Sequence, residues 1–158
     1  MAYRISRNIE ASFVDFLKTE FLADWGSENV EVAFARIYEI DLPSILVQVG
    51  TSDHNRVELG SSSTLRNTQV LLNVFTKSEG MQRDIKDWLI TKIKSGIPYY
   101  NFTISGGVVT SKIADGRLRV LNIADTPINF EQDRNTLDLH DRFRWQIVLT
   151  VSRGKLET

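Results

Sequence analysis

Cysteine is absent from the 158 residues, which excludes a disulfide framework, a thiolate metal site and a cysteine nucleophile. Histidine occurs only at His54 and His140, and two ligands so far apart form no metal-binding pattern. Each histidine has an acidic neighbour, but neighbouring residues on a strand point to opposite faces, so a general base is not indicated. We therefore expect no catalytic residue, metal or cofactor, and a protein that is not an enzyme.

An excess of charge of either sign is also lacking, because 19 lysine and arginine residues nearly balance 20 acidic ones and leave a formal charge of -1. No basic field exists to hold nucleic acid nonspecifically. Long apolar runs are missing as well, so no membrane span is predicted. Arg4, Arg7 and Glu10 interrupt the apolar residues of the amino terminus, which predicts no signal peptide and indicates folding in the cytoplasm.

Three short motifs lack the surroundings that their chemistry requires. The run Ser61–Ser63 has no glycine framing of a nucleophile elbow. Gly106 and Gly107 belong to neither phosphate-binding fingerprint, so they indicate a hairpin turn. The acidic stretch DTPINFEQDRNTLDLHD lacks the register and the glycine of a calcium loop, and we interpret it as a solvated connection.

Basic residues alternate with aromatic ones near the carboxyl end, a pattern that can mark a platform for single-stranded nucleic acid. Phe143 and Trp145 fall on the apolar face of a predicted strand, however, and the basic residues fall on the other face. A core face and a solvated face therefore explain the pattern better. The basic residues are Arg142, Arg144, Arg153 and Lys155.

Two segments predict amphipathic helices. Apolar residues recur every three or four positions over residues 7–25, where Ser6 is the expected N-cap and Gly26 the expected stop. The second helix has Ser78 as N-cap, an apolar stripe that includes Ile85 and Trp88, and Gly96 at its end. Ion pairs between Glu79 and Arg83, and between Arg83 and Asp87, are expected on its exposed face.

The rest of the chain predicts strands joined by turns. Strands are expected over residues 30–40, 45–49, 69–76, 100–104, 117–123 and 143–151, with a further short one over 56–59. Residues 60–67 predict a mobile polar loop, and the dipeptide Asp115-Gly116 predicts a turn. Together the elements predict a single α+β domain over residues 1–158, with a mixed or mostly antiparallel sheet and two main helices on one face.

The order of these elements resembles that of the tail-terminator, or tail-completion, proteins of long-tailed bacteriophages. The similarity covers residues 7–151 and rests on the first helix, the strand in LPSILVQVG, a polar loop, the joint TQVLLNVFTKSEGMQRDIKDWLITKI and the late strands. In that family a strand with a Val-Phe or similar pair leads through a Ser/Glu start into a helix. Here these positions are Val74-Phe75 and Ser78-Glu79.

The resemblance implies a virion structural protein that forms a ring, expected to be a hexamer. Such a ring caps the finished tail tube, ends its polymerisation and receives the head connector, and DNA later passes through its hole. The implied partners are further copies of the chain, the tail-tube protein and the head-completion or connector protein. The implied location is the head-proximal end of the virion tail, after assembly in the host cytoplasm.

The expected contact regions are the loops 51–67 and 105–116, which are long enough to reach a tube or connector and to order on contact. Acidic side chains facing the hole would repel DNA and keep it sliding. The expected interface residues are Asp53, His54, Arg56, Ser61, Ser62, Ser63, Arg66, Lys112 and Asp115, and the expected lumen residues are Glu131, Asp133 and Asp138.

Other roles remain open at this point. A head-completion or connector protein, or a tail-tube-initiating protein at the far end of the tail, would use a similar small α+β subunit. A small enzyme or ligand-binding domain is a different class of protein. It would need a pocket with convergent polar groups and titrating residues with shifted pKa values.

Overall fold

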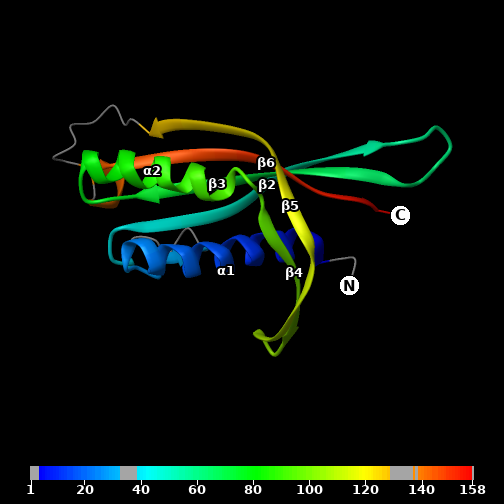
Figure 1. Cartoon of the computed structure of the whole chain (residues 1–158), viewed down its shortest axis with the longest axis horizontal. Coiled ribbons are helices and arrows are strands. Elements are labelled where there is room, and N and C mark those ends of the chain that lie inside the picture. Colours follow the sequence, from blue (N-terminus) through cyan, green and yellow to red (C-terminus); the bar gives the residue numbers. More distant parts are fainter. Residues whose placement is uncertain (1–3, 33–38, 129–136, 138, 158) are drawn as a thin grey trace.

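The computed structural model describes residues 4–32, 39–128, 137 and 139–157, and its six described strands form one sheet in the order β1-β2-β3-β6-β5-β4 (Figure 1). Only β1 and β2 pair in parallel, and the other neighbours are antiparallel. This arrangement confirms the predicted α+β class. The elements are α1 (Ile5–Trp25), β1 (Val30–Glu31), β2 (Ser44–Arg56), β3 (Thr64–Phe75), α2 (Glu79–Ile93), β4 (Ile97–Ser105), β5 (Val108–Ile128), α3 (Leu139–Arg142) and β6 (Arg144–Glu157).

Both long helices cover the same face of the sheet, as the sequence predicts, because α1 and α2 contribute to one hydrophobic core (Figure 1). Cross-strand rows of apolar residues form the sheet side of this core, and one row joins Val47, Leu72 and Ile147 of β2, β3 and β6. The helices supply fully buried side chains such as Phe13 and Leu89. Each buried side chain of this size stabilises the fold by about 1.5–3 kcal/mol.

Local signals predict α2 correctly. The Ser78 hydroxyl accepts a hydrogen bond from the Met81 amide at 3.2 Å, and Glu79 pairs with Arg83 at 2.9 Å. Gly96 follows the helix with a φ of +88°, a left-handed conformation that suits glycine. The expected pair between Arg83 and Asp87 is wrong, because the Asp87 carboxylate lies 2.8 Å from Lys86 Nζ instead.

The amino-terminal helix begins earlier than predicted, which changes the role of Ser6. The N-cap of α1 is Arg4, and no side chain caps the helix there. Ser6 lies inside the first turn, where its hydroxyl accepts a hydrogen bond from Arg66 at 3.2 Å. Gly26 ends the helix with a φ of +70°, as expected.

The strand predicted over residues 30–40 is wrong in its extent. Among the described residues of this segment, only Val30 and Glu31 form a strand, and residues 39 and 40 lie outside any strand. Residues 33–38 lie outside the part of the chain that the structure describes.

A long hairpin replaces the loop predicted between the next two strands. β2 continues to Arg56 and β3 begins at Thr64, and the two pair along their whole length up to Arg56↔Thr64. The polar residues Thr64 and Asn67, which we expected in a loop, therefore belong to a strand, and residues 57–59, expected as a strand, form part of the connecting turn. Cross-strand pairing outweighs the weak strand propensity of these polar residues.

The turn predicted at Asp115-Gly116 is also wrong, because both residues lie inside the continuous strand β5. The first part of β5 pairs with β4, up to Leu118↔Ile97, and the second part pairs with β6, from Arg119↔Ser152 onward. Gly116 has a φ of +89°, so the turn-like dipeptide marks an irregular point close to where one strand changes its partner.

Candidate interaction surface

Two β-hairpins extend from the layer of helices and sheet, and we call them the first and second arms (Figure 1). The first arm consists of residues 51–67 at the joined ends of β2 and β3. Apolar side chains are exposed at its end, where Val57 is more than half exposed and Leu59 is fully exposed. Its turn contains Gly60, whose φ of +83° lies in the left-handed region that glycine adopts readily.

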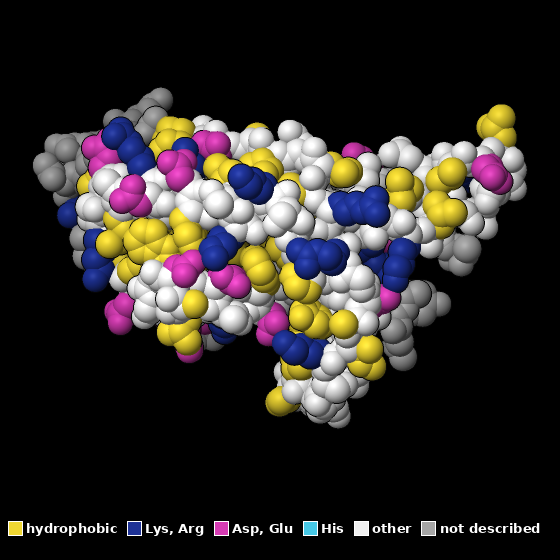
Figure 2. Space-filling model, viewed as in Figure 1, with side chains coloured by type: hydrophobic (Ala, Val, Ile, Leu, Met, Phe, Trp, Pro, Cys, Tyr) yellow, Lys and Arg dark blue, Asp and Glu magenta, His cyan; other side chains and the backbone are white. Residues whose placement is uncertain are grey.

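The second arm consists of residues 103–113 of β4 and β5 and points in a different direction (Figure 1). Gly106 and Gly107, both with positive φ, form its turn, which confirms the hairpin predicted there. Val108, Val109 and Ile113 are each more than half exposed. Figure 2 shows hydrophobic side chains on both projections. Exposed apolar groups that lie together are typical of interaction surfaces.

Most of the expected interface residues lie on the first arm. Asp53, His54 and Arg56 are exposed on β2, and the serine run forms part of the turn, where the Ser61 hydroxyl accepts a hydrogen bond from the Ser63 amide at 3.1 Å. Ser62 is exposed. These residues are therefore accessible for contacts with another molecule.

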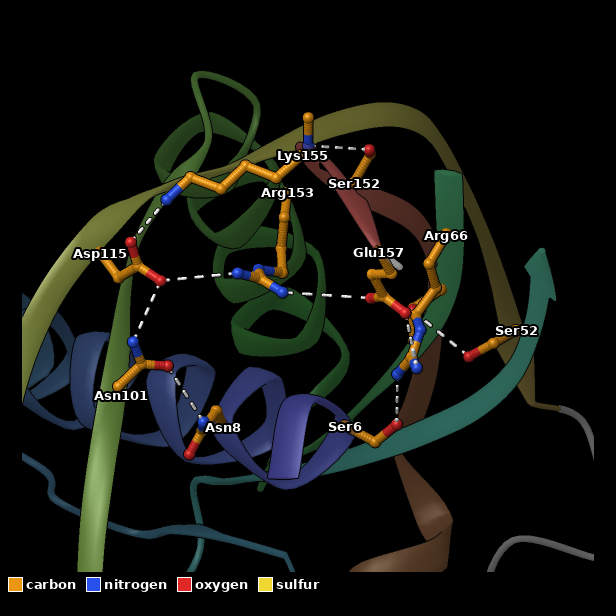
Figure 3. Close-up of polar contacts among 12 residues, drawn as sticks. Ser6, Asn8, Ser52, Arg66, Asn101, Asp115, Ser152, Arg153, Lys155 and Glu157 are labelled. Carbon is orange, nitrogen blue, oxygen red and sulfur yellow. Dashed lines mark hydrogen bonds and ion pairs between the residues drawn. The ribbon is translucent and has the colours of Figure 1, made fainter. Parts of the chain in front are cut away.

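The expected residues Arg66 and Asp115 take part in a polar network at the base of the arms (Figure 3). Asp115 accepts hydrogen bonds from Asn101 of β4 at 3.0 Å and from Lys155 of β6. Asn101 in turn accepts a hydrogen bond from Asn8 of α1 at 3.3 Å. This half of the network joins α1, β4, β5 and β6.

The other half of the network returns to α1. The Arg153 guanidinium lies 3.5 Å from the Asp115 carboxylate on one side and 4.0 Å from the Glu157 carboxylate on the other. Glu157 pairs with Arg66 of β3 at 3.0 Å, and Arg66 donates to Ser6. The contacts form a closed circuit that starts and ends in the first turns of α1, so it links α1 to the bases of both arms.

Hydrogen bonds set the charge states in this region. The hydrogen bond from Lys155, followed by that from Asn101, holds the pKa of the Asp115 carboxyl below its usual value. A hydrogen bond to Asp15 raises the pKa of Lys112, whose Nζ lies 3.1 Å from that carboxylate and 4.7 Å from the centre of the Tyr100 ring. Lys112 thus ties the second arm to α1, through a partly exposed pair of the kind that contributes little to stability.

The outer edge of β4 is covered by α1. The Tyr100 amide donates to the Ser12 hydroxyl at 3.1 Å, and the Phe102 amide donates to Asn8 Oδ1 at 3.3 Å. Side chains four residues apart on a helix lie about one turn apart, which roughly matches the spacing of alternate amides along a strand. The buried polar residues Asn8 and Ser12 therefore satisfy an edge that could otherwise pair with another chain.

Among the described residues, the outer edge of β2 has a strand partner only near its start. Within the described part of the chain, β1 pairs only with Ile45 and Leu46, and no strand pairs with the outer edge of β2 beyond them. An irregularity in the ladder between β2 and β3 lies between Val49 and Ser52, at the start of the first arm. Open edges of this kind can accept a strand from another subunit.

A hollow of about 490 Å³ lies where β2 begins and is lined by residues including Ile40, Lys77 and His140. His140 Nε2 lies 2.8 Å from the Ile40 carbonyl oxygen, and His54 is exposed on the first arm. The structure thus places the two histidines in different regions. The expected lumen residues Glu131, Asp133 and Asp138 lie outside the described residues.

The described residues show neither a metal-binding group nor a membrane-spanning helix. They contain no group of histidine and acidic side chains that could hold a metal ion. They also contain no helix with a stretch that is both long and apolar enough to cross a membrane. Comparison with models of known protein families and with curated protein sequences found no match.

Several residues of this surface were missed at the sequence level. Val57 and Leu59 flank Glu58 in the predicted short strand, and Val108 and Val109 directly follow the Gly-Gly turn. Apolar residues beside a turn signal could have indicated exposed hairpin ends. Asn8 and Ser12, polar residues four apart on an otherwise apolar helical face, could have indicated a polar contact with a strand.

Proposed function

We propose that this protein is a ring-forming structural subunit of a long-tailed bacteriophage. In this role it caps the tail tube, ends tube polymerisation and joins the tail to the head connector. The observation that carries the proposal is the pair of arms, whose ends expose apolar side chains such as Leu59 and Val108 to solvent. Contact with other subunits would remove these groups from water, which is the usual driving force for association.

The arrangement of the two arms suits a ring. A closed ring requires a heterologous contact, in which two different surfaces of each subunit meet. The arms leave a common base in different directions, and the open edge of β2 offers a third contact region among the described residues. The polar circuit at the base keeps these surfaces in a fixed relation, which favours one rotation between neighbouring subunits.

A structural role also agrees with the charge of the chain. The formal charge of -1 gives no general attraction for DNA, so DNA can pass through the ring without being held. In this proposal Glu131, Asp133 and Asp138 line the hole.

The test is the mass of the purified protein in solution, measured by light scattering over a range of concentrations, with and without purified tail tubes. We expect a closed ring alone or on the tubes. A protein that stays monomeric with tubes and with connectors would contradict the proposal. A ring that binds connectors and ignores tubes would favour the head-completion role instead.

Variants test whether the arms make the ring. The double variant Val57→Ser, Leu59→Ser removes the exposed apolar groups at the end of the first arm. Leu22→Ser is the matched control, because Leu22 is an exposed apolar residue on α1. We expect the double variant to weaken the ring and the control to leave it intact. If the unmodified protein, the double variant and the control all assemble equally, the first arm is not part of the interface.

A further inference from the structure

β5 and β6 separate at one point of the sheet, and a gap opens between them. Arg119↔Ser152 ends the ladder between the two strands. β5 then turns to pair with β4, while β6 passes an irregularity at residues 153–155 and pairs with β3 again at Leu156 and Glu157. Beyond Ser152, no described strand pairs with the β5-facing edge of β6. We call this gap, between residues 116–119 and 153–155, the fork.

A hollow of about 470 Å³ occupies the fork, and half of its lining residues are basic. Figure 2 shows Lys and Arg side chains gathered on this face between the two projections. The lining residues are Ser95, Gly116, Arg117, Leu118, Arg119, Arg153, Gly154 and Lys155.

The acidic groups nearby neutralise only part of this charge. Asp115 pairs with Lys155 and Arg153. Arg117 donates to the Gly96 carbonyl at 3.0 Å, and no described carboxylate lies within ion-pair distance of it. The same is true of Arg119 among the described residues, so two guanidinium groups in the fork have no carboxylate partner.

Two glycines with a left-handed backbone lie at the fork. Gly116 and Gly154 both have positive φ, and a Cβ at Gly116 would meet no atom within 4 Å. The guanidinium of Arg119 lies close to Gly154, where a Cβ would be 3.7–4.0 Å from its atoms. The Gly154 amide already donates to the Ser152 hydroxyl at 3.1 Å, so the fork combines a strand edge that is only partly unpaired with charged groups beside it.

We infer that the fork binds an extended acidic segment of another protein, which adds a strand along the edge of β6 beyond Ser152 and places carboxylates against Arg117 and Arg119. Strand addition supplies main-chain hydrogen bonds to such a segment. The guanidinium group binds a carboxylate through two parallel hydrogen bonds, which makes arginine suited to this recognition.

The composition of the fork favours a protein segment over nucleic acid. No aromatic residue is among those that line the hollow, so bases would find no stacking platform there. The inference does not depend on ring formation, because the fork lies within one chain.

The experiment measures binding of a fluorescein-labelled peptide of alternating glutamate and threonine to the full chain, by fluorescence anisotropy at low and high salt. The key variant is Arg119→Glu, and Arg119→Ala serves if charge reversal prevents folding. Arg83→Glu is the matched control, because it makes the same charge change on the exposed face of α2. A lysine–threonine peptide and an oligothymidylate of similar length are the comparison ligands.

We expect salt-sensitive binding of the acidic peptide that Arg119→Glu weakens about tenfold or more, and that Arg83→Glu changes by less than about twofold. Hydrogen exchange at the amides of residues 153–157 should slow when the peptide binds. The inference is overturned if the acidic peptide fails to bind at low salt or if Arg119→Glu has no effect. Equal binding of the basic peptide, tighter binding of the oligothymidylate, or unchanged exchange would also overturn it.

Discussion

Removing the two side chains that cover the edge of β4 should destabilise the fold strongly. In the double variant Asn8→Ala, Ser12→Ala, the amides of Tyr100 and Phe102 lose their acceptors inside the protein. An unsatisfied buried donor costs about 1–3 kcal/mol, so two cost about 2–6 kcal/mol. Alanine favours the helix by about 0.5 kcal/mol at each position, which leaves a net loss of about 1–5 kcal/mol. For a domain of this size, each kcal/mol lowers the Tm by about 2–4 °C.

Equilibrium urea unfolding gives the free energy of unfolding for this test. Thr19→Ala is the control, because the exposed Thr19 hydroxyl only donates to the Asp15 carbonyl within α1, and we expect a change within about 0.5 kcal/mol. Hydrogen exchange provides a local readout, since the Tyr100 and Phe102 amides should exchange faster in the double variant. A double variant as stable as the control, with unchanged exchange at both amides, would refute the assignment of Asn8 and Ser12 as edge caps.

Three further outcomes are expected. Ile85→Ala should lower the free energy of unfolding by about 2–5 kcal/mol, because Ile85 is fully buried; an unchanged urea midpoint would show that the face of α2 is misassigned. Gly96→Ala should lower the Tm more than Gly60→Ala. Both glycines have a positive φ, but only a Cβ at Gly96 would lie 2.5 Å from the Leu118 carbonyl oxygen. Equal losses of Tm in the two variants would contradict the clash. The pKa of Asp115 is lowered in the folded protein, so its charge stabilises the fold above about pH 4, the unfolded pKa, and this contribution is lost as the pH falls through the folded pKa. In Asp115→Asn the free energy of unfolding should therefore fall less steeply with decreasing pH. An unchanged pH dependence would argue against this role.

The elements that the sequence predicts correctly are those with local causes. Ser78, Glu79 and Gly96 all specify the ends of α2 through contacts within a few residues. The turn signal at Asp115-Gly116 failed because the conformation there depends on β4 and β6, which lie elsewhere in the sequence. A glycine inside a strand was the available sign of such an irregularity.

The candidate surfaces could be predicted only in part. The first arm was placed in the correct segment, but its polar sequence indicated a loop because cross-strand pairing cannot be read from propensity alone. The fork was missed because Arg117 and Arg119 are far in sequence from Arg153 and Lys155, and the sheet topology brings them together. Alternation along β6 correctly separated the core face from the polar face, but it gave no sign of a shared hollow.

The cover that α1 gives to β4 also has a consequence for folding during synthesis. The two amides of β4 and their acceptors on α1 are separated by 88 and 94 residues. Contacts of such long range close late, and strand edges left open meanwhile are prone to aggregation. Here the ribosome makes the covering helix before the strand, so the acceptors are already present when the edge of β4 emerges. The order of elements along the chain thus shortens the time for which this edge is exposed to other nascent chains.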